Sequence, residues 1–585
     1  MSNRLKVMLT TEGTYPFHQG GVSTWCDILV NKLKSVDYIL YSVTMDPFVT
    51  QKFKLPETTR IIRMPLWGTE EPSEHLATPF SSSYMAKQRV TDEHLKTEFI
   101  PIFIELIREI ISKEKDPLKF GLILFELHKY FQHYEYKVSF KSEPAWDIYK
   151  KFILDFAKDS KNRLAQPDVY GMIQSIGWLY RFLNIVNTPV PKVNVTHASA
   201  AAFCGIPCVI AKLQDKTPFM LTEHGVYLRE QYLSLSKREN SSFLNTFLIR
   251  LIHSITALNY AYADQVSPVC DYNTRWEKRF GVSPKNIKVI YNGVDPNVFV
   301  EASPIAHDRP TVVTIARIDP IKDILTLIRS AGIVREQVPN VKYIVYGSVS
   351  VPSYYTECIK LVKQLNLEET ITFAGHTLNM TAAYHSGDVV ALSSISEAFP
   401  YSVVEAMMTG KPVVTTDVGG ISEALGDTGI LCDPCDANGL AQGIVKLLLN
   451  SDLRESLGME GRQRALNFFT LDRVLELHLK SYIRMAANAV DRKVPIVLTF
   501  NIADRLRKQR MLMEKGYALV LSGFHREAIA QFRLALKEVP DSAAVPVLLL
   551  ELADAYNNLG EFDHAFIEME KYDLWVKLVA MNKPA

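Results

Sequence analysis

The sequence has no long apolar run and no signal peptide. No stretch of 18 or more consecutive apolar residues occurs, and the segment that comes nearest, Phe247–Ala263, contains Arg250 and His253. A membrane-spanning helix needs about 20 apolar residues, so we expect this segment to be a buried helix. The amino terminus lacks the apolar core of a secretion signal. These absences predict a soluble, cytoplasmic protein without a transmembrane segment.

Neither sign of charge is in surplus, and cysteine is scarce. Lys and Arg number 65 against 64 Asp and Glu, a formal net charge of +1, which gives no bulk attraction to nucleic acid or to an anionic membrane. The seven cysteines are scattered and odd in number, which argues against a disulfide framework. Cys432 and Cys435 have CxxC spacing, but no second pair or nearby histidine completes a zinc site. We therefore predict no metal site.

The sequence does contain a repeated alternation of short apolar strands and helical segments. At 585 residues the chain is too long for one core and is expected to form about three domains. The alternation runs through residues 1–296 and again through 309–470, which predicts an α/β fold with two parallel sheets. A helical insertion is expected at about 66–190, where large apolar residues follow helical spacing. The segment 297–310 contains two prolines and is expected to be a hinge.

The C-terminal part of the chain changes character. A helix at 471–490 is expected to pack back on the first domain. Residues 505–580 then repeat loosely with a period of 37, in which Gly523 recurs as Gly560. This pattern resembles tetratricopeptide helix pairs and predicts an all-α helical-repeat extension. Two units are few for an independent solenoid, so we expect them to pack on the rest of the chain or to extend an interface.

The segment Ser396–Lys411 carries the clearest functional pattern. Short β-branched runs precede and follow it, which predicts a strand-to-helix turn with Pro400 at the first helical position. Glu397 would then lie in the loop that faces the helix N-terminus, and Glu405 one to two turns inside the helix. Free N–H groups at a helix N-terminus suit a phosphate, and carboxylates suit the hydroxyls of ribose and hexose. The combination suggests a sugar nucleotide, although two glutamates at this spacing also occur by chance on solvated helices.

Further candidates lie where strands end, because that is the edge at which α/β sheets bind ligands. Gly20 and Gly21 stand between the first strand and the first helix. Missing side chains there would let backbone amides approach a phosphate, and an ordinary tight turn is the alternative. His197 and His224 end two later strands. We favour a site role for both histidines over simple packing or surface positions.

Two cations open the second domain. Arg317 leaves its first strand and Lys322 enters the next helix, so both could converge on a pyrophosphate. Arginine offers a bidentate fork for such a group, and lysine a mobile point charge. The alternative for each side chain is simple solvation at the protein surface.

Taken together, these residues resemble the family-4 retaining glycosyltransferases of GT-B fold, in which two Rossmann-like domains face each other across a cleft. The features that carry the resemblance are Glu397 with Glu405, Arg317 with Lys322, Gly20 with Gly21, and the run Tyr291-Asn-Gly-Val-Asp. Longer stretches are similar to the cytoplasmic glycosyltransferases of Pel exopolysaccharide synthesis, namely 12–25, 222–230, 317–323 and 354–358. The likeness covers roughly residues 1–490 and excludes the helical repeats.

The resemblance implies a role for each candidate. Glu405 would bind the nucleotide ribose, and Glu397 the hydroxyls of the donor hexose. The groups implied for the diphosphate are Arg317 and Lys322, helped by the backbone near Gly20 and Gly21 and by Phe399, Pro400, Tyr401 and Ser402. The implied catalytic residues are Glu397, His197 and His224. His197 matches the family's strand-end histidine near the reacting sugar, and His224 lies at the next strand end.

The family is taken to act with retention, without a metal and without a tightly bound cofactor. This agrees with a pair of cations stabilising the leaving diphosphate. Ala398 departs from the family, in which glycine is common at this position, and it leaves the identity of the donor open.

We therefore expect a retaining glycosyltransferase that moves a hexose onto a growing exopolysaccharide, with glucose from UDP-glucose as the favoured donor. One alternative keeps the fold but uses a lipid, protein or small-metabolite acceptor, chosen by the 66–190 insertion, since fold does not determine substrate. Another is a scaffold that uses the helical repeats. A glycoside hydrolase is disfavoured because cations accompany the carboxylates. The repeats would recruit a membrane-bound biosynthetic partner at the periphery of the inner membrane, and no nucleic acid is expected to bind.

Overall fold

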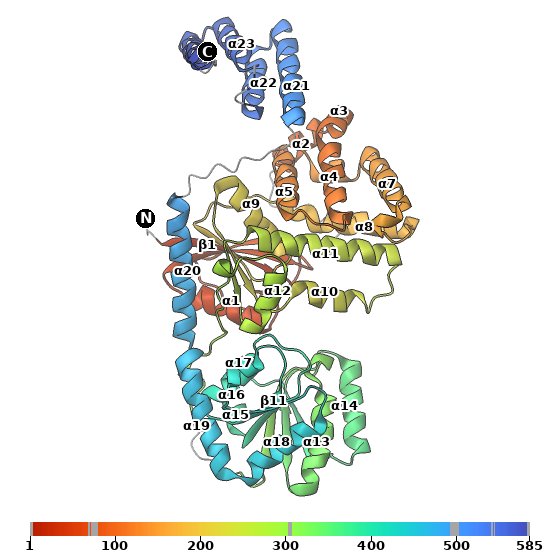
Figure 1. Ribbon diagram of the computed structural model, residues 1–585, viewed down its shortest axis with the longest axis vertical. Helices are drawn as coiled ribbons and strands as arrows, with labels where there is room; N and C mark the ends of the chain where they lie inside the picture. The colour runs from red at the N-terminus through yellow and green to blue at the C-terminus, as the bar shows by residue number, and fades with distance from the viewer. Residues whose placement is uncertain are drawn as a thin grey trace. The chain divides into compact units, whose positions relative to one another are not determined.

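The computed structural model describes residues 4–67, 71, 80–301, 307–491, 502–539, 542 and 544–581 (Figure 1). The chain divides into two compact units, 1–491 and 492–585. Residues 68–70 and 72–79 of the expected insertion, and residues 302–306 of the expected hinge, lie outside the described residues. Within the described part, no helix has both the length and the apolar character that crossing a membrane requires.

Six parallel strands form the first sheet of the larger unit. They are β1 (Leu5–Glu12), β2 (Val36–Thr44), β3 (Arg60–Pro65), β4 (Val195–Ala198), β5 (Phe219–Glu223) and β6 (Gln265–Pro268). Their order is β3-β2-β1-β4-β5-β6, the Rossmann order, which leaves a switch point between β1 and β4. Every residue of β4 and β5 is buried, as expected of a parallel sheet covered on both faces.

The second sheet repeats this pattern with six further parallel strands. They are β7 (Thr311–Ile315), β8 (Lys342–Tyr346), β9 (Ile371–Gly375), β10 (Val389–Leu392), β11 (Val413–Thr416) and β12 (Ile430–Cys432). Their order, β12-β11-β10-β7-β8-β9, leaves the switch point between β7 and β10. The prediction of two Rossmann-like domains is confirmed. We call each sheet with its helices the first and the second domain; the boundaries expected near residues 296 and 309 stay predictions.

Helices connect the strands of both domains. Those of the first domain outside the insertion are α1 (Gly21–Lys32), α9 (Ile206–Asp215), α10 (Tyr227–Leu235), α11 (Ser242–Tyr262) and α12 (Thr274–Arg279). Those of the second domain are α13 (Ile324–Gln337), α14 (Pro352–Gln364), α15 (Met380–His385), α16 (Tyr401–Met408), α17 (Ile421–Leu425), α18 (Ala437–Leu449) and α19 (Ser451–Phe468). Ser241 caps α11 by accepting the N–H of Leu244. The helix predicted at 247–263 is the larger part of α11, and its burial is confirmed.

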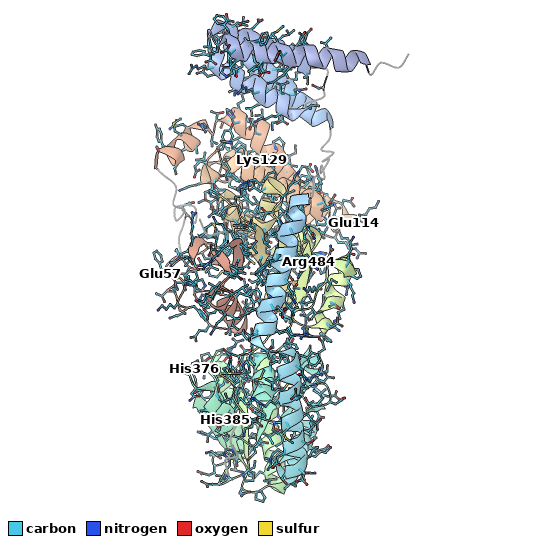
Figure 2. The ribbon with its side chains drawn as sticks, turned by 90° about the vertical axis from the view of Figure 1, so that its left-hand side faces the viewer. Glu57, Glu114, Lys129, His376, His385 and Arg484 are labelled. Atoms are coloured by element: carbon cyan, nitrogen blue, oxygen red, sulfur yellow. The ribbon has the colours of Figure 1, made fainter. Side chains whose placement is uncertain are left out.

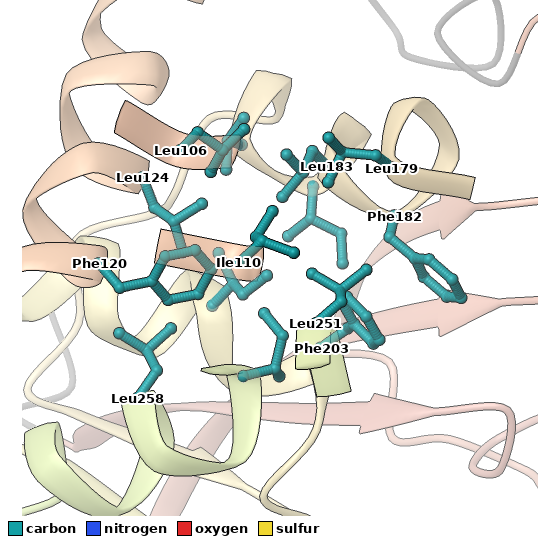
Figure 3. Packing of buried hydrophobic residues seen from close by; sticks show 14 of the residues in the cluster. Leu106, Ile110, Phe120, Leu124, Leu179, Phe182, Leu183, Phe203, Leu251 and Leu258 are labelled. Atoms are coloured by element: carbon teal, nitrogen blue, oxygen red, sulfur yellow. The ribbon is translucent and has the colours of Figure 1, made fainter. Parts of the chain in front are cut away.

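The segment between β3 and β4 is helical and shares the core of the first domain. Its helices are α2 (Phe80–Arg89), α3 (Asp92–His94), α4 (Ile100–Ile111), α5 (Pro117–Phe131), α6 (Tyr136–Phe140), α7 (Glu143–Lys158) and α8 (Val169–Phe182). Figure 3 shows Ile110 of α4 and Phe120 of α5 packed toward Leu251 and Leu258 of α11. In Figure 1, α4 and α5 lie on the far side of the first sheet from the second domain. Most of this segment is therefore a fixed part of the first domain's core.

The long helix α20 (Leu471–Asp491) follows the second domain but packs on the first. Tyr482 and Met485 of α20 belong to the same buried cluster as Val7 of β1 and Trp25 of α1. Figure 2 shows α20 running along the first domain, with Arg484 labelled on it. The larger unit is therefore closed by a helix that links both domains.

The smaller unit is a pair of helix pairs. Its helices are α21 (Ile502–Leu521), α22 (His525–Glu538), α23 (Val545–Asn558) and α24 (Phe562–Met581). Gly523 (φ +78°) and Gly560 (φ +74°) end the first helix of each pair in the left-handed region that glycine favours. The predicted helical C-terminal region is confirmed, and its kinship with tetratricopeptide repeats stays a prediction.

Candidate functional site

The switch point of the second domain brings together two of the predicted residues. Lys322 ends a short 3-10 turn after β7, and Glu397 lies in the loop after β10. Lys322 Nζ forms an ion pair with Glu397 Oε1, and Ser394 Oγ donates a hydrogen bond to the same oxygen at 2.7 Å. The side chains of Lys322 and Glu397 are 18% and 13% exposed, so the pair is shielded while retaining some access to solvent.

Glu405 occupies the fifth position of α16, one turn inside the helix as the sequence predicts. Tyr384 Oη donates a hydrogen bond to Glu405 Oε2 at 2.7 Å. Burial raises the pKa of Glu405 from 4.5 to about 7, while the hydrogen bond from Tyr384 acts to lower it. Near neutral pH this carboxyl therefore exists in both protonation states and can either accept or donate a hydrogen bond.

The N-terminus of α16 is not capped by a side chain. Pro400 is the N-cap residue, one position earlier than expected, and it offers no acceptor. The first backbone N–H groups of the helix, beginning at Tyr401 and Ser402, have no partner within the helix and point toward its N-terminus. Phe399 is buried, and its carbonyl accepts a hydrogen bond from Asn292 Nδ2 at 3.0 Å. Phe399 and Pro400 thus shape the turn. Tyr401 and Ser402 are partly exposed, and the ring of Tyr401 packs against buried apolar residues.

Arg317 lies two residues after Ile315, the last residue of β7. Its side chain is exposed and, among the residues that the structure describes, it has no hydrogen-bond or ion-pair partner. Lys322 is meanwhile engaged by Glu397. The convergence of both cations on one diphosphate therefore stays a prediction.

The two glycines of the first domain lie opposite the start of α16. Gly20 is the N-cap residue of α1, and the helix begins at Gly21. A Cβ atom on Gly21 would lie 3.7 Å from Cδ2 of Tyr401, an ordinary van der Waals separation. Two elements that the sequence singled out separately, one in each domain, are thus in contact.

His224 lies directly after β5 and packs edge-on against Trp25 of α1, with ring centroids 4.6 Å apart. The residue is partly exposed, and its Nε2 atom is buried without a hydrogen-bond partner among the described residues. Burial, and to a lesser extent the nearby His478, lowers the pKa of His224 from 6.5 to about 3. The imidazole is therefore neutral at physiological pH.

His197 differs from its sequence-based prediction in one respect. It is completely buried in β4. Its Nδ1 lies 2.7 Å from Tyr482 Oη of α20, and its Nε2 lies 2.7 Å from Thr222 Oγ1 of β5. Because both ring nitrogens are occupied and shielded, they are not free to exchange a proton with a substrate. The geometry favours a supporting role for His197, next to Trp25, over the catalytic role expected from the sequence.

Contacts between the two domains involve residues to which the sequence assigned no role. Arg229 Nη1 of α10 donates a hydrogen bond to Ser396 Oγ at 3.1 Å. Glu423 of α17 accepts the backbone N–H groups of Asp271 at 2.7 Å and Tyr272 at 2.5 Å. We call these contacts, together with that between Gly21 and Tyr401, the domain junction. The sequence gives one hint of these contacts, since Arg229 lies five positions after the candidate residue His224.

The CxxC pair has no metal-like surroundings in the structure. Among the described residues, no group of three or more His, Cys, Asp or Glu side chains is arranged to hold a metal ion. All seven cysteines are free thiols. Cys432 ends β12 and Cys435 is exposed in the turn that follows.

Residues 297–464 match the family described as glycosyl transferases group 1. We call residues 297–464 the group 1 domain, after the family that they match. Residues 5–285 match a domain of unknown function, DUF3492. The group 1 domain thus spans the second sheet with Lys322, Glu397 and Glu405. The first sheet, with His224, lies in the part that matches the domain of unknown function.

Curated relatives align with the chain at low identity. N-acetyl-alpha-D-glucosaminyl L-malate synthase of Bacillus anthracis is 26% identical in an alignment of 208 residues that covers 34% of this chain and 54% of that protein. D-inositol 3-phosphate glycosyltransferase of Corynebacterium efficiens is 26% identical in an alignment of 262 residues that covers 38% of this chain and 62% of that protein. The chain therefore spans little more than half the length of these relatives.

Solved structures share the fold over a larger part of the chain. Sucrose-phosphate synthase from Thermosynechococcus elongatus superimposes with a TM-score of 0.54 at 18% identity, covering 83% of this chain and 100% of that one. Anabaena Alr3699/HepE in complex with UDP gives 0.52 at 16% identity, covering 82% and 100%. The group 1 domain and the first domain together therefore have the two-domain GT-B fold.

Proposed function

We propose that this protein is a retaining glycosyltransferase that transfers a hexose, glucose from UDP-glucose in the first instance, to a growing exopolysaccharide. The observation that carries the proposal is the ion pair of Lys322 and Glu397 at the switch point of a group 1 domain. Glu405 lies within the same strand-to-helix unit, with Tyr384 donating to it. Cation, carboxylates and a free helix N-terminus are together the groups needed to bind a nucleotide diphosphate sugar.

In this proposal each group meets one part of the donor. Lys322 exchanges Glu397 for the diphosphate, and Arg317 adds its exposed guanidinium on the same side. The released Glu397 then accepts hydrogen bonds from hexose hydroxyls, and Glu405 accepts those of the ribose. First-turn N–H groups at Tyr401 and Ser402 donate to the phosphate. Fixed cations and N–H groups stabilise the charge that develops on a leaving diphosphate, so the reaction needs no metal ion.

The transfer step itself breaks the bond between the anomeric carbon and the diphosphate oxygen and forms one to an acceptor hydroxyl oxygen on the same face of the sugar. The acceptor proton passes to the departing diphosphate. His224 lies on the opposite side of the domain junction, next to Trp25. With its low pKa the neutral imidazole acts as a hydrogen-bonding group toward the sugar and not as a cation.

The comparisons support the proposed donor more strongly than the proposed acceptor. Anabaena Alr3699/HepE is described in complex with UDP, with UDP and glucose, and with UDP-glucose, which makes UDP-glucose the first donor to test. The curated relatives are named for different acceptors, including L-malate and D-inositol 3-phosphate. A lipid, protein or small-metabolite acceptor on the same fold is therefore the second candidate.

Calorimetric titration of UDP, GDP and ADP in the absence of divalent metal tests the proposal. We expect UDP to bind the wild-type protein and Glu405→Ala to abolish that binding. Glu357→Ala, which removes an exposed carboxylate from α14 of the same domain, is the matched control and should bind UDP normally. Binding of none of the three nucleotides would overturn the proposal, and preference for GDP or ADP would overturn the choice of donor.

We further propose that the helical unit recruits a membrane-bound biosynthetic partner and so holds the enzyme at the membrane periphery. The proposal is supported by a difference in burial between equivalent residues of the two repeats. Ile529 and Phe532 of α22 are buried, whereas the residues 37 positions later, Phe566 and Met569 of α24, are 66% and 39% exposed. An apolar face that one repeat buries and the next leaves open suits a further protein surface. Deletion of 505–585 that left membrane-fraction association unchanged would refute this role.

A further inference from the structure

Glu12 joins the loops that follow three adjacent strands. It is the last residue of β1, at the switch point of the first domain, and is partly exposed. Its Oε2 accepts the backbone N–H of Cys204 at 3.1 Å, and its Oε1 accepts the hydroxyl of Tyr227 at 3.1 Å. Cys204 lies in the short turn after β4, and Tyr227 is the first residue of α10, after β5. One carboxylate thus ties together the ends of β1, β4 and β5.

Helix α10 carries this attachment to the other domain. Tyr227 and Arg229 are two positions apart, so their side chains leave the helix about 200° apart. Tyr227 is directed inward to Glu12, and Arg229 is exposed and reaches Ser396 Oγ of the second domain at 3.1 Å. Ser396 immediately precedes Glu397 in the sequence. The helix is therefore held on one side by the first domain and contacts the loop of Glu397 on the other.

We propose that Glu12 is a positioning residue that, through Tyr227 and α10, holds Arg229 against the loop 394–399 and so fixes Glu397 for donor binding. The consequence for donor binding rests on the proposed function, whereas the mechanical link from Glu12 to the loop does not. Burial raises the pKa of Glu12 to about 7, so burial disfavours the charged carboxylate. Two hydrogen-bond donors from two different loops offset part of that cost.

Two variants cut the link at different points. Tyr227→Phe removes only the hydroxyl that donates to Glu12, and Ser396→Ala removes only the oxygen that accepts from Arg229. Steady-state kinetics with UDP-glucose should show that each raises the KM for the donor about three- to tenfold with little change in kcat, the range expected for one lost hydrogen bond. Because both act on one link, the double variant should be no worse than the poorer single variant.

Two comparison variants separate positioning from general destabilisation. Tyr149→Phe removes a buried hydroxyl that lies 2.6 Å from Ser175 Oγ in the insertion, and it should leave the KM for the donor at the wild-type value. Glu12→Gln keeps an oxygen that can accept from Tyr227 and should retain most of the donor affinity, whereas Glu12→Ala should match Tyr227→Phe. Additive effects of Tyr227→Phe and Ser396→Ala would overturn the proposal.

Hydrogen exchange measured by mass spectrometry on the ligand-free full chain tests the link without any assumption about activity. We expect Tyr227→Phe and Glu12→Ala to speed exchange both in α10 and in peptides that contain 394–399, and Tyr149→Phe to change neither. Faster exchange in α10 with an unchanged loop would overturn the proposal. If the wild-type protein bound no nucleotide, the proposed function would fail while this measurement still decided whether Glu12 controls the loop.

Discussion

Lys322 neutralises Glu397 across β7 and β10, the two strands that flank the switch point of the second sheet. Neither side chain is more than about a fifth exposed. Leaving either charge without its partner in the unliganded protein would therefore lower the free energy of unfolding. In the function we propose, an incoming diphosphate replaces Glu397 as the partner of Lys322 and frees Glu397 to accept hydrogen bonds from a sugar. Under that proposal the ion pair keeps both side chains in place until the donor binds.

Removing the ammonium group of Lys322 should impair the reaction. We expect Lys322→Ala to lower kcat/KM for UDP-glucose by about 100-fold, the usual effect of deleting one group that stabilises developing charge. Initial rates of UDP release measure this, and Lys322→Arg should recover part of the loss because it keeps the charge. Lys446→Ala, which removes an exposed cation from α18 of the same domain, serves as control. A wild-type rate for Lys322→Ala would exclude the proposed role.

Nucleotide affinity should depend on pH through Glu405. Its pKa is raised to about 7, so the carboxylate that we propose as acceptor of the ribose hydroxyls is protonated as the pH falls through 7. We expect UDP to bind more tightly at pH 8 than at pH 6. Tyr384→Phe should move the midpoint upward, because the hydrogen bond from Tyr384 lowers this pKa. Titration calorimetry between pH 5.5 and 8.5 measures both effects, and Glu405→Gln should flatten the profile. A profile unchanged in Glu405→Gln would assign the titration to another group.

The buried His478 should make the fold sensitive to acid. Its pKa is lowered from 6.5 to about 4, chiefly by burial. Stability from a histidine with a lowered pKa is complete above 6.5 and is lost as the pH falls toward 4. When the pH is lowered from 7 to 5, protonation linked to this group alone should reduce the free energy of unfolding by about 2 kcal/mol.

Denaturant unfolding of wild type and His478→Gln at pH 7 and pH 5 measures this cost. The variant should lose about 2 kcal/mol less than the wild type on acidification. His376→Gln, at an exposed histidine of the second domain (Figure 2), is the control. Equal losses in wild type and His478→Gln would show that His478 does not titrate in this window.

A methyl group at the domain junction should disturb the contact between domains. A Cβ atom on Gly420 would lie 2.5 Å from Cβ of Cys270 in the first domain and 2.6 Å from the carbonyl oxygen of Ala398. We expect Gly420→Ala to weaken the neighbouring attachment of Glu423 to Asp271 and to reduce transfer activity at least tenfold. Hydrogen exchange at 271–272 reports on that attachment.

The matched control is Gly332→Ala in α13, where the nearest heavy atom to the new Cβ would be 4.0 Å away. Because alanine is the better helix former, this variant should be as stable as the wild type or up to about 1 kcal/mol more stable. Wild-type exchange and activity in Gly420→Ala would mean that the two domains adjust without cost.

Local sequence patterns are sufficient to predict the elements whose structure depends on neighbouring residues along the chain. The strand-to-helix turn around Glu397, the helix start at Gly21 and the buried helix α11 follow from propensities and periodicity over a few turns. β12 has only three residues, so its apolar pattern is too short to indicate a strand from the sequence alone.

The sequence by itself determined the α/β class, the two Rossmann-like halves, the helical C-terminal region and the neighbourhood of Glu397 and Glu405. Only the tertiary structure decided which polar groups meet. Arg229 and Ser396 are 167 positions apart, and His197 and Tyr482 are 285 apart. The physical reason is that a histidine at a strand end carries the same local pattern whether its nitrogens are free or occupied. Helix α20 places Tyr482 beside β4, so in the folded protein Nδ1 of His197 is occupied.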